Sequence, residues 1–314
     1  MAVAFVFPGQ GSQAVGMGKA LAEAFAPARR VFEEVDDALG EKLSEMTWNG
    51  PAETLTLTEN AQPALMAVSL AALRVLETEA GLDLARDAAF VAGHSLGEYS
   101  ALAAARSLAI ADAARLLRIR GRAMQKAVPV GVGAMAALLG VELEAAKSIA
   151  AEAAATGVCA AANDNGGGQV VLSGAKLAVE RAVEIAKSHG VKRAMMLPVS
   201  APFHCALMQP AADAMAEALA QISVAQPSVP LVANVLAEPI RDPACIVRSL
   251  VQQVTNTVRW RESVLFMARA GVTVFHEVGA GKVLTGLIKR IAETASASSI
   301  GTPEDITRYK AAHA

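Results

Sequence analysis

The stretch from residue 88 to residue 105 reads AAFVAGHSLGEYSALAAA, and the fold class follows from it. Its apolar start, 88–92, predicts a buried strand, and its alanine-rich end, 98–105, predicts a helix. Between them stands Gly93-His94-Ser95-Leu96-Gly97, a G-x-S-x-G sequence. Glycines on a strand–turn–helix path let the chain turn sharply and leave the serine hydroxyl exposed above a sheet. The stretch therefore predicts Ser95 as a nucleophile in an α/β protein.

Strand and helix patterns alternate on both sides of this stretch. Further strands are predicted at 3–7, 229–234 and 272–278, and helices at 17–39, 62–80, 110–128, 212–220, 246–253, 261–270 and 283–292. This alternation is typical of a parallel sheet covered by helices. We expect residues 1–128 and 199–314 to form one large, discontinuous α/β-hydrolase-like domain. After Thr294 we expect a mobile tail with a last helical turn or two.

The middle of the chain has a different rhythm. Its predicted order is strand 134–141, helix 143–155, strands 158–162 and 169–172, helix 177–188 and strand 192–197. The order β-α-β-β-α-β is that of a ferredoxin-like unit. We therefore expect a small ferredoxin-like domain over residues 129–198, inserted into the large one.

Composition excludes several classes of protein. The chain is 54% apolar with a net charge of -2, which excludes a disordered chain and gives no reason to expect a nucleic-acid partner. Its longest charge-free stretches, 194–212 and 218–237, contain prolines, so we expect no membrane helix. Three separated cysteines argue against disulfides and a zinc site. With no recognisable signal peptide, a cytoplasmic protein is expected.

A serine nucleophile needs a base, and the chain has five histidines. His204 is the candidate by elimination, because it lies in an irregular loop where the inserted domain rejoins the large one. The other four have structural explanations: His94 in the turn itself, His189 at a helix end, His276 in a predicted strand and His313 in the tail.

Three other patterns have alternative readings. Gly9-Gln10-Gly11-Ser12-Gln13-Ala14 fits a dinucleotide fingerprint, but no acidic residue follows a second strand, so the loop instead suits an oxyanion-hole N–H group. Gly279-Ala280-Gly281-Lys282 lacks the other residues of a phosphate loop. Four arginines crowd the helix after the turn, namely Arg115, Arg118, Arg120 and Arg122. They form either a solvated face or an anion site, and spacing does not choose among them.

Taken together, these motifs resemble those of malonyl-CoA:acyl carrier protein transacylases. The resemblance rests on segments that run in the family's order over nearly the whole chain: FPGQGSQ at 7–13, GHSLGEY at 93–99, RIRG at 118–121, NDN at 163–165, GQVVLSG at 168–174, PFH at 202–204, QVTN at 253–256 and EVGAGKVL at 277–284.

The resemblance implies a ping-pong acyl transfer of fatty acid synthesis. Ser95 would be the nucleophile and His204 the general base, oriented by the main-chain carbonyl of Gln253. The backbone N–H groups of Gln10 and Leu96 would form the oxyanion hole, and Arg120 would bind the malonyl carboxylate. The implied partners are malonyl-CoA and acyl carrier protein. No cofactor or metal is implied, since the coenzyme A thioester is a substrate, and a monomer is expected.

Two positions bear on this expectation. Thr257 stands where the family often has proline, which affects local loop geometry. Phe203 resembles the bulky residue that, in related polyketide acyltransferases, accompanies a preference for malonyl over methylmalonyl substrates.

Alternative functions remain open on the sequence. They are an acyltransferase of a polyketide or malonate decarboxylase system, a G-x-S-x-G serine hydrolase or thioesterase, and a non-catalytic binding module. An acidic carrier would also need local cations, for which the candidates are Lys187, Lys192, Arg193, Arg259, Arg261, Lys289 and Arg290.

Overall fold

Strand β1 (Ala2–Phe7) lies near the centre of a six-stranded sheet in the computed structural model, which describes residues 2–199 and 201–313. The strand order is β10 (Ser296–Ile300), β9 (Val272–Val278), β1, β2 (Phe90–Gly93), β7 (Leu231–Val232) and β8 (Pro239–Ile240). The first five strands are parallel, which confirms the predicted parallel sheet although β10 itself was not predicted, and β8 adds an antiparallel edge.

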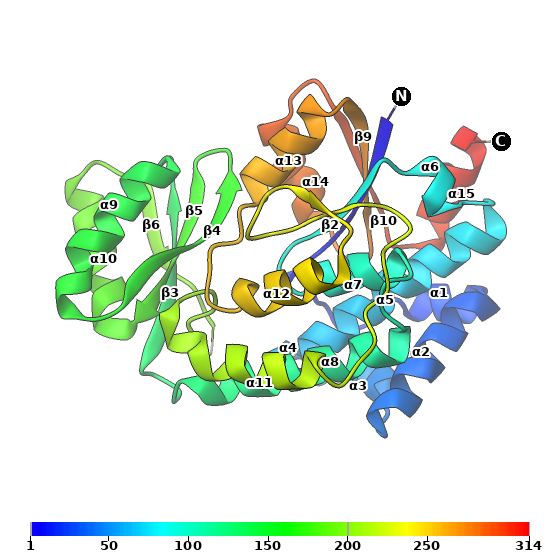
Figure 1. The fold of residues 1–314 in the computed structure, drawn as a ribbon, viewed down its shortest axis with the longest axis horizontal. Coiled ribbons are helices and arrows are strands. Elements are labelled where there is room, and N and C mark those ends of the chain that lie inside the picture. Colours follow the sequence, from blue (N-terminus) through cyan, green and yellow to red (C-terminus); the bar gives the residue numbers. More distant parts are fainter. Residues whose placement is uncertain (1, 200, 314) are drawn as a thin grey trace.

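Helices cover both faces of this sheet (Figure 1). Because successive side chains of a strand point to opposite faces, Phe5 and Phe7 enter one apolar cluster and Ala4 and Val6 another. The first cluster includes residues of α2 (Ala26–Leu39), α5 (Thr58–Glu79), α7 (Gly97–Ala104), α8 (Ile110–Ala127), α11 (Gln209–Leu219) and α12 (Pro243–Gln253). The second includes residues of α13 (Trp260–Arg269) and α14 (Val283–Ile291). The result is a three-layer α/β/α arrangement.

A second sheet of four antiparallel strands stands beside the first (Figure 1). Its order is β4 (Cys159–Gly166), β5 (Gln169–Ala175), β3 (Gly133–Leu139) and β6 (Arg193–Met196). One face packs on α9 (Leu143–Ala153) and α10 (Lys176–Ser188) through its own apolar cluster. This confirms the ferredoxin-like unit. All four strands fall within 129–198, while the domain boundaries stay a prediction, and Ser200 at the predicted junction lies outside the described residues.

The two sheets are joined where β4 meets the segment after α12. Asp164 N–H donates to Val258 O at 2.9 Å, and Val258 N–H donates to Ala162 O at 2.8 Å. The Thr257 hydroxyl donates to Ala161 O at 2.6 Å. Thr257, the departure from the family's proline, therefore contributes a hydrogen bond to this junction that proline would lack.

The helices predicted at 17–39 and 62–80 have different bounds in the structure. The stretch 17–39 divides into α1 (Lys19–Ala24) and α2, because Phe25 is extended and Pro27 cannot donate to the carbonyl one turn back. Helix α5 begins at Thr58, ahead of Pro63. Proline has no N–H, so the carbonyl of Glu59 instead accepts from Arg118 Nη1 at 2.8 Å.

The predicted mobile tail is wrong. Residues after Thr294 form β10 at the sheet edge and helix α15 (Pro303–His313), whose Ile306 and Tyr309 are buried. The strand sequence Ser-Ala-Ser-Ser-Ile carries little apolar signal, because an edge strand needs few buried side chains. Short helices α3 (Leu43–Asn49), α4 (Ala52–Thr56) and α6 (Leu84–Asp87) were also not predicted.

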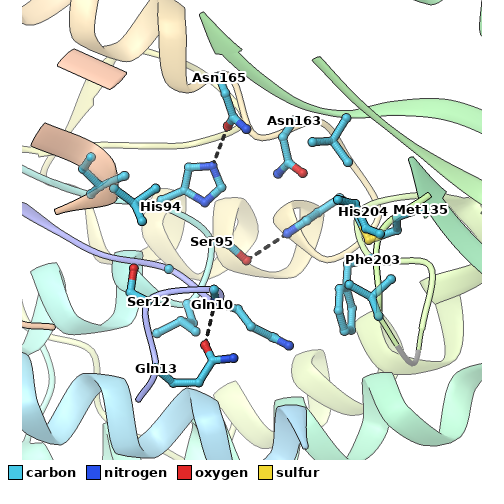
Figure 2. Close-up of a pocket in the computed structure, with 18 of the residues that line it drawn as sticks. Gln10, Ser12, Gln13, His94, Ser95, Met135, Asn163, Asn165, Phe203 and His204 are labelled. Atoms are coloured by element: carbon cyan, nitrogen blue, oxygen red, sulfur yellow. Dashed lines mark hydrogen bonds between the residues drawn. The ribbon is translucent and has the colours of Figure 1, made fainter. Parts of the chain in front are cut away.

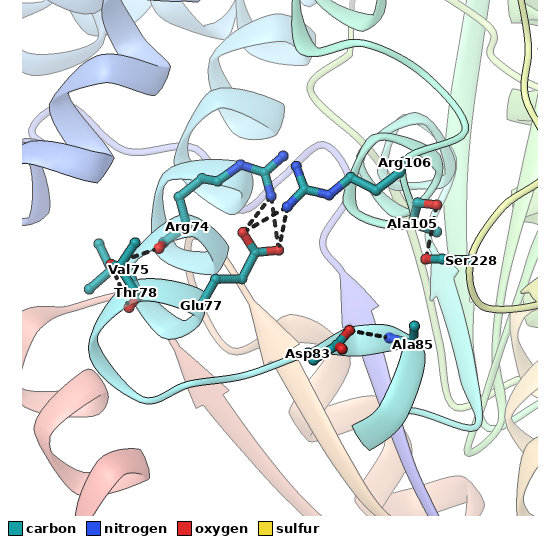
Figure 3. Close-up of polar contacts among 9 residues, drawn as sticks. All are labelled: Arg74, Val75, Glu77, Thr78, Asp83, Ala85, Ala105, Arg106 and Ser228. Carbon is teal, nitrogen blue, oxygen red and sulfur yellow. Dashed lines mark hydrogen bonds and ion pairs between the residues drawn. The ribbon is translucent and has the colours of Figure 1, made fainter.

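The carboxyl end of α7 is tied to its neighbours (Figure 3). The Glu77 carboxylate on α5 accepts from Arg74 Nη1 at 2.9 and 2.7 Å and from Arg106 Nη2 at 3.0 Å to each oxygen. Arg106 follows α7 and has a φ of 62°. The Ser228 hydroxyl donates to Ala105 O at 3.1 Å. These contacts hold the helix that begins at the G-x-S-x-G turn.

No helix within residues 2–199 and 201–313 has the length and apolar character needed to cross a bilayer. The three cysteines, Cys159, Cys205 and Cys245, are free thiols. Across the same residues, no cluster of three or more His, Cys, Asp or Glu side chains is arranged to hold a metal ion.

Candidate active site

Ser95 lies on a turn in which two positions, 93 and 97, have room only for glycine. A Cβ atom at Gly93 would lie 1.9 Å from the carbonyl carbon of Gly97, and one at Gly97 would lie 2.2 Å from Phe7 O. The turn brings Ser95 to a φ of 53°, in the left-handed region that side chains rarely adopt. This is the sharp strand-to-helix turn that the sequence predicts.

Asn234 braces the same turn from outside it. Its Oδ1 accepts the Ser95 N–H at 2.8 Å, and its Nδ2 donates to Gly93 O at 2.7 Å. One amide side chain thus replaces the backbone hydrogen bonds that the turn lacks. Sequence reasoning missed Asn234, because a lone asparagine at the end of a predicted strand carries no motif.

Ser95 and His204 point toward each other (Figure 2), with 2.8 Å between Ser95 Oγ and His204 Nε2. His204 Nδ1 lies 2.7 Å from the main-chain oxygen of Gln253. A carbonyl only accepts, so Nδ1 carries the proton and Nε2 offers a lone pair to the serine hydroxyl. Gln253 is the last residue of α12, where helix carbonyls lack partners within the helix. The structure thus places Gln253 where the resemblance implied.

The surroundings keep His204 neutral. The residue is 4% exposed and, like Ser95, has a positive φ, 59°. Burial, reinforced by the charge of Arg120, lowers the pKa of His204 to about 3. A neutral imidazole with a free Nε2 is the form able to take a proton from serine.

Arg120 is the arginine of α8 that reaches the site. It is 1% exposed, and its Nη2 donates to Ser95 Oγ at 3.1 Å and to Gln253 Oε1 at 2.7 Å. Its Nη1 donates to Gln62 Oε1 at 2.7 Å. The other three arginines are engaged elsewhere: Arg115 with Asp112, Arg118 with Glu41 and Asn60, and Arg122 with Glu59. The tertiary structure thus brings Arg120, and not the other three arginines, into contact with Ser95.

The other histidines do not contact the serine hydroxyl. His94 Nε2 lies 2.9 Å from Asn165 Oδ1, on the opposite side of the turn from His204 (Figure 2). His189 directly follows α10, and His276 Nδ1 lies 2.9 Å from the Ser298 hydroxyl. His313 stacks on Tyr309. Their structural interpretation agrees with these contacts.

A cavity of about 720 Å³ opens in front of Ser95. Its walls are the loop after β1, the turn, the inner face of the small sheet and α14. Gln10 and Leu96 both line it, and within the described residues neither of their backbone N–H groups has an acceptor. Lys282 and Arg290 line the same cavity as cations. The serine, the histidine, Arg120 and the two predicted oxyanion-hole residues thus all line one cavity.

This fold holds a serine on a sharp strand-to-helix turn, a neutral histidine in hydrogen-bond contact with it and a buried guanidinium. Together they define the class of enzymes that carry acyl groups on serine. The model of the acyl transferase domain family matches residues 4–309, and the chain belongs to that family.

Named relatives cover nearly the whole chain. The malonyl CoA-acyl carrier protein transacylase of Salmonella typhimurium is 48% identical over 300 residues, 96% of each chain. The crystal structure of acyl-carrier-protein-S-malonyltransferase from Bartonella henselae is 57% identical, with a TM-score of 0.97 over 100% of this chain and 99% of that one. A malonyl-transacylase solved with a type II PKS acyl-carrier protein is 42% identical, with a TM-score of 0.95 over 99% of this chain and 100% of that one.

Proposed function

We propose that the chain transfers the malonyl group of malonyl-CoA to the thiol of acyl carrier protein, for use in fatty acid synthesis. The observation that carries this proposal is the buried guanidinium of Arg120, whose Nη2 lies 3.1 Å from Ser95 Oγ inside the cavity. An acyl group on Ser95 that ends in a carboxylate fits beside that charge, and an uncharged acyl group leaves it unpaired. The names of the relatives, malonyl CoA-acyl carrier protein transacylase and acyl-carrier-protein-S-malonyltransferase, describe this class of reaction.

In the first half-reaction Ser95 Oγ attacks the thioester carbonyl carbon while its proton passes to His204 Nε2. The oxyanion that forms is held by the N–H groups of Gln10 and Leu96, each worth about 10²–10³-fold in rate. Collapse of the intermediate breaks the carbon–sulfur bond, and the proton on His204 goes to the departing sulfur of coenzyme A. A malonyl-serine ester remains.

The second half-reaction runs the same steps with another thiol. The phosphopantetheine thiol of the carrier protein gives its proton to His204 and attacks the ester carbonyl. The carbon–oxygen bond then breaks, and Ser95 recovers the proton. The base needs no carboxylate partner, because the main-chain oxygen of Gln253 fixes its tautomer.

Three finer points belong to the same proposal. Phe203 lines the cavity and is 8% exposed, which supports malonyl over the branched methylmalonyl. No cofactor is required by the steps above. We place the reaction in the cytoplasm, supported by three free thiols, and treat the monomer as the working unit.

The test uses radiolabelled malonyl-CoA with and without carrier protein bearing its phosphopantetheine arm. Label should remain on the enzyme without the acceptor and move to the carrier thiol with it, and Ser95→Ala should take up no label. Release of free malonate in place of carrier labelling would instead identify a hydrolase. Transfer only to a polyketide carrier would identify the related polyketide acyltransferase.

A further inference from the structure

The side-chain amide of Gln253 lies between the base, the nucleophile and Arg120. Its Nε2 donates to Ser95 O at 2.9 Å, to Asn234 Oδ1 at 3.3 Å and to Glu98 Oε2. Its Oε1 accepts from Arg120 Nη2 at 2.7 Å. Acceptors therefore surround the nitrogen end of the amide, and a donor faces the oxygen end.

This arrangement permits only one orientation of the amide. A flipped amide would set its NH₂ against the Arg120 guanidinium, where both groups donate, and its oxygen against Ser95 O and Asn234 Oδ1, which only accept. The hydrogen bonds to these three groups would be lost in a buried site, since Gln253 is fully buried.

Glu98 supplies the decisive acceptor. It lies in the first turn of α7, is 1% exposed, and accepts from Asn234 N–H through Oε1 at 3.2 Å and from Gln253 through Oε2. Burial raises the pKa of Glu98 to about 7, so the protein keeps a carboxyl here at an energetic cost. In either protonation state a carboxyl retains an acceptor oxygen on each side, whereas an amide has an acceptor on one side only.

We propose that Glu98 is a positioning residue for recognition of the substrate carboxylate. It fixes the amide of Gln253, and that amide turns Arg120 Nη2 toward Ser95 Oγ. The inference rests on the proposed malonyl transfer, because it assigns the selectivity of that reaction to a residue behind the clamp. Glu98 does not line the cavity and so acts through Gln253 rather than on the substrate.

Gln253 has two separate roles, one through its main-chain oxygen and one through its side-chain amide. The main-chain oxygen of Gln253 that orients His204 belongs to the end of α12 and does not move when the side-chain amide turns. Loss of Glu98 should therefore disturb Arg120 more than the serine–histidine pair. Malonyl transfer needs Arg120 and should fall further than transfer of acetyl, which has no carboxylate.

The experiment compares Ser95 acylation by labelled malonyl-CoA and acetyl-CoA in the wild type and in Glu98→Gln. We expect the malonyl-to-acetyl ratio of kcat/KM to fall by about 10- to 100-fold, the equivalent of one lost hydrogen bond to a charged group. Asp36→Asn is the matched control. Asp36, on α2, is also a buried carboxylate and accepts from Ser44 N at 2.9 Å and from Ser44 Oγ at 2.6 Å. This change should leave the ratio unaltered.

A second variant keeps the test decisive if Glu98→Gln does not fold. Gln253→Leu removes the amide and keeps the main-chain oxygen, and it should lower the same ratio, with Glu98→Gln adding nothing further in the double variant. Equal losses for malonyl and acetyl in Glu98→Gln, or in Gln253→Leu where only that variant folds, would overturn the proposal. A wild type that takes no malonyl label would instead overturn the proposed function.

Discussion

Ser95 Oγ lies 2.8 Å from Nε2 of His204, although 109 positions separate the two residues and both have a positive φ. One stands on the turn between β2 and α7, and the other on the loop that follows the small sheet. Strained backbone at both residues persists because the surroundings hold it, through Asn234 on one side and Gln253 on the other.

His204→Ala should slow acylation of Ser95 by malonyl-CoA by about 10²- to 10⁴-fold, because the serine loses its proton acceptor. Single-turnover labelling measures this rate. His189→Ala, at the exposed end of α10, is the control and should match the wild type. An undiminished labelling rate in His204→Ala would assign the base to another residue.

Arg120→Ala should reduce malonyl transfer far more than acetyl transfer. Each hydrogen bond to a charged group is worth about 1.5–3 kcal/mol, or roughly 10- to 150-fold. Comparison of kcat/KM for the two thioesters measures the effect, with Arg115→Ala on the exposed face of α8 as control. If both transfers fall equally, Arg120 does not bind the substrate carboxylate.

Acylation should depend only weakly on pH between 8 and 5. A histidine with the ordinary pKa of about 6.5 would lose its neutral form about 30-fold over that range. His204 stays neutral, because burial and Arg120 lower its pKa to about 3. Stopped-time labelling at fixed ionic strength measures the profile. An inflection between pH 6 and 7 that persists in Glu98→Gln would show that His204 titrates normally.

Gly97→Ala should destabilise the fold by about 1–3 kcal/mol or more, since its Cβ would lie 2.2 Å from the backbone oxygen of Phe7. Chemical denaturation measures the free energy of unfolding. Gly286→Ala is the matched control, because Gly286 lies within α14 with open space around it. This substitution should raise the free energy of unfolding by about 0.5–1 kcal/mol. Equal stability of both variants would mean that the turn adapts to a side chain.

Transfer to an acidic carrier protein should weaken as salt rises, because exposed cations near the cavity steer its approach. Of the seven candidates, Arg259 and Arg261 already pair with Glu262 and Asp164. Arg290 lines the cavity and is exposed, so Arg290→Glu should slow carrier transfer more than it slows the first half-reaction. A salt-independent rate would argue against steering.

The fold was predictable from sequence wherever apolar periodicity is strong. Strand β9 has its predicted bounds, and the order of the small unit is as expected. Prediction failed at β10, where an edge strand of serine and alanine looks like a tail. It also failed at α5, because Pro63 suggests a helix start although a neighbouring arginine satisfies the carbonyl that proline leaves unpaired.

The sequence by itself determined the turn that carries Ser95, because G-x-S-x-G between a strand and a helix is a local property of consecutive residues. Elimination and a family resemblance added His204, Gln253 and Arg120. Only the tertiary structure decided the tautomer of His204, which of the four arginines contacts Ser95, and the contacts made by Asn234 and Glu98. These depend on hydrogen bonds between segments 49 to 139 residues apart, and no local pattern records such contacts.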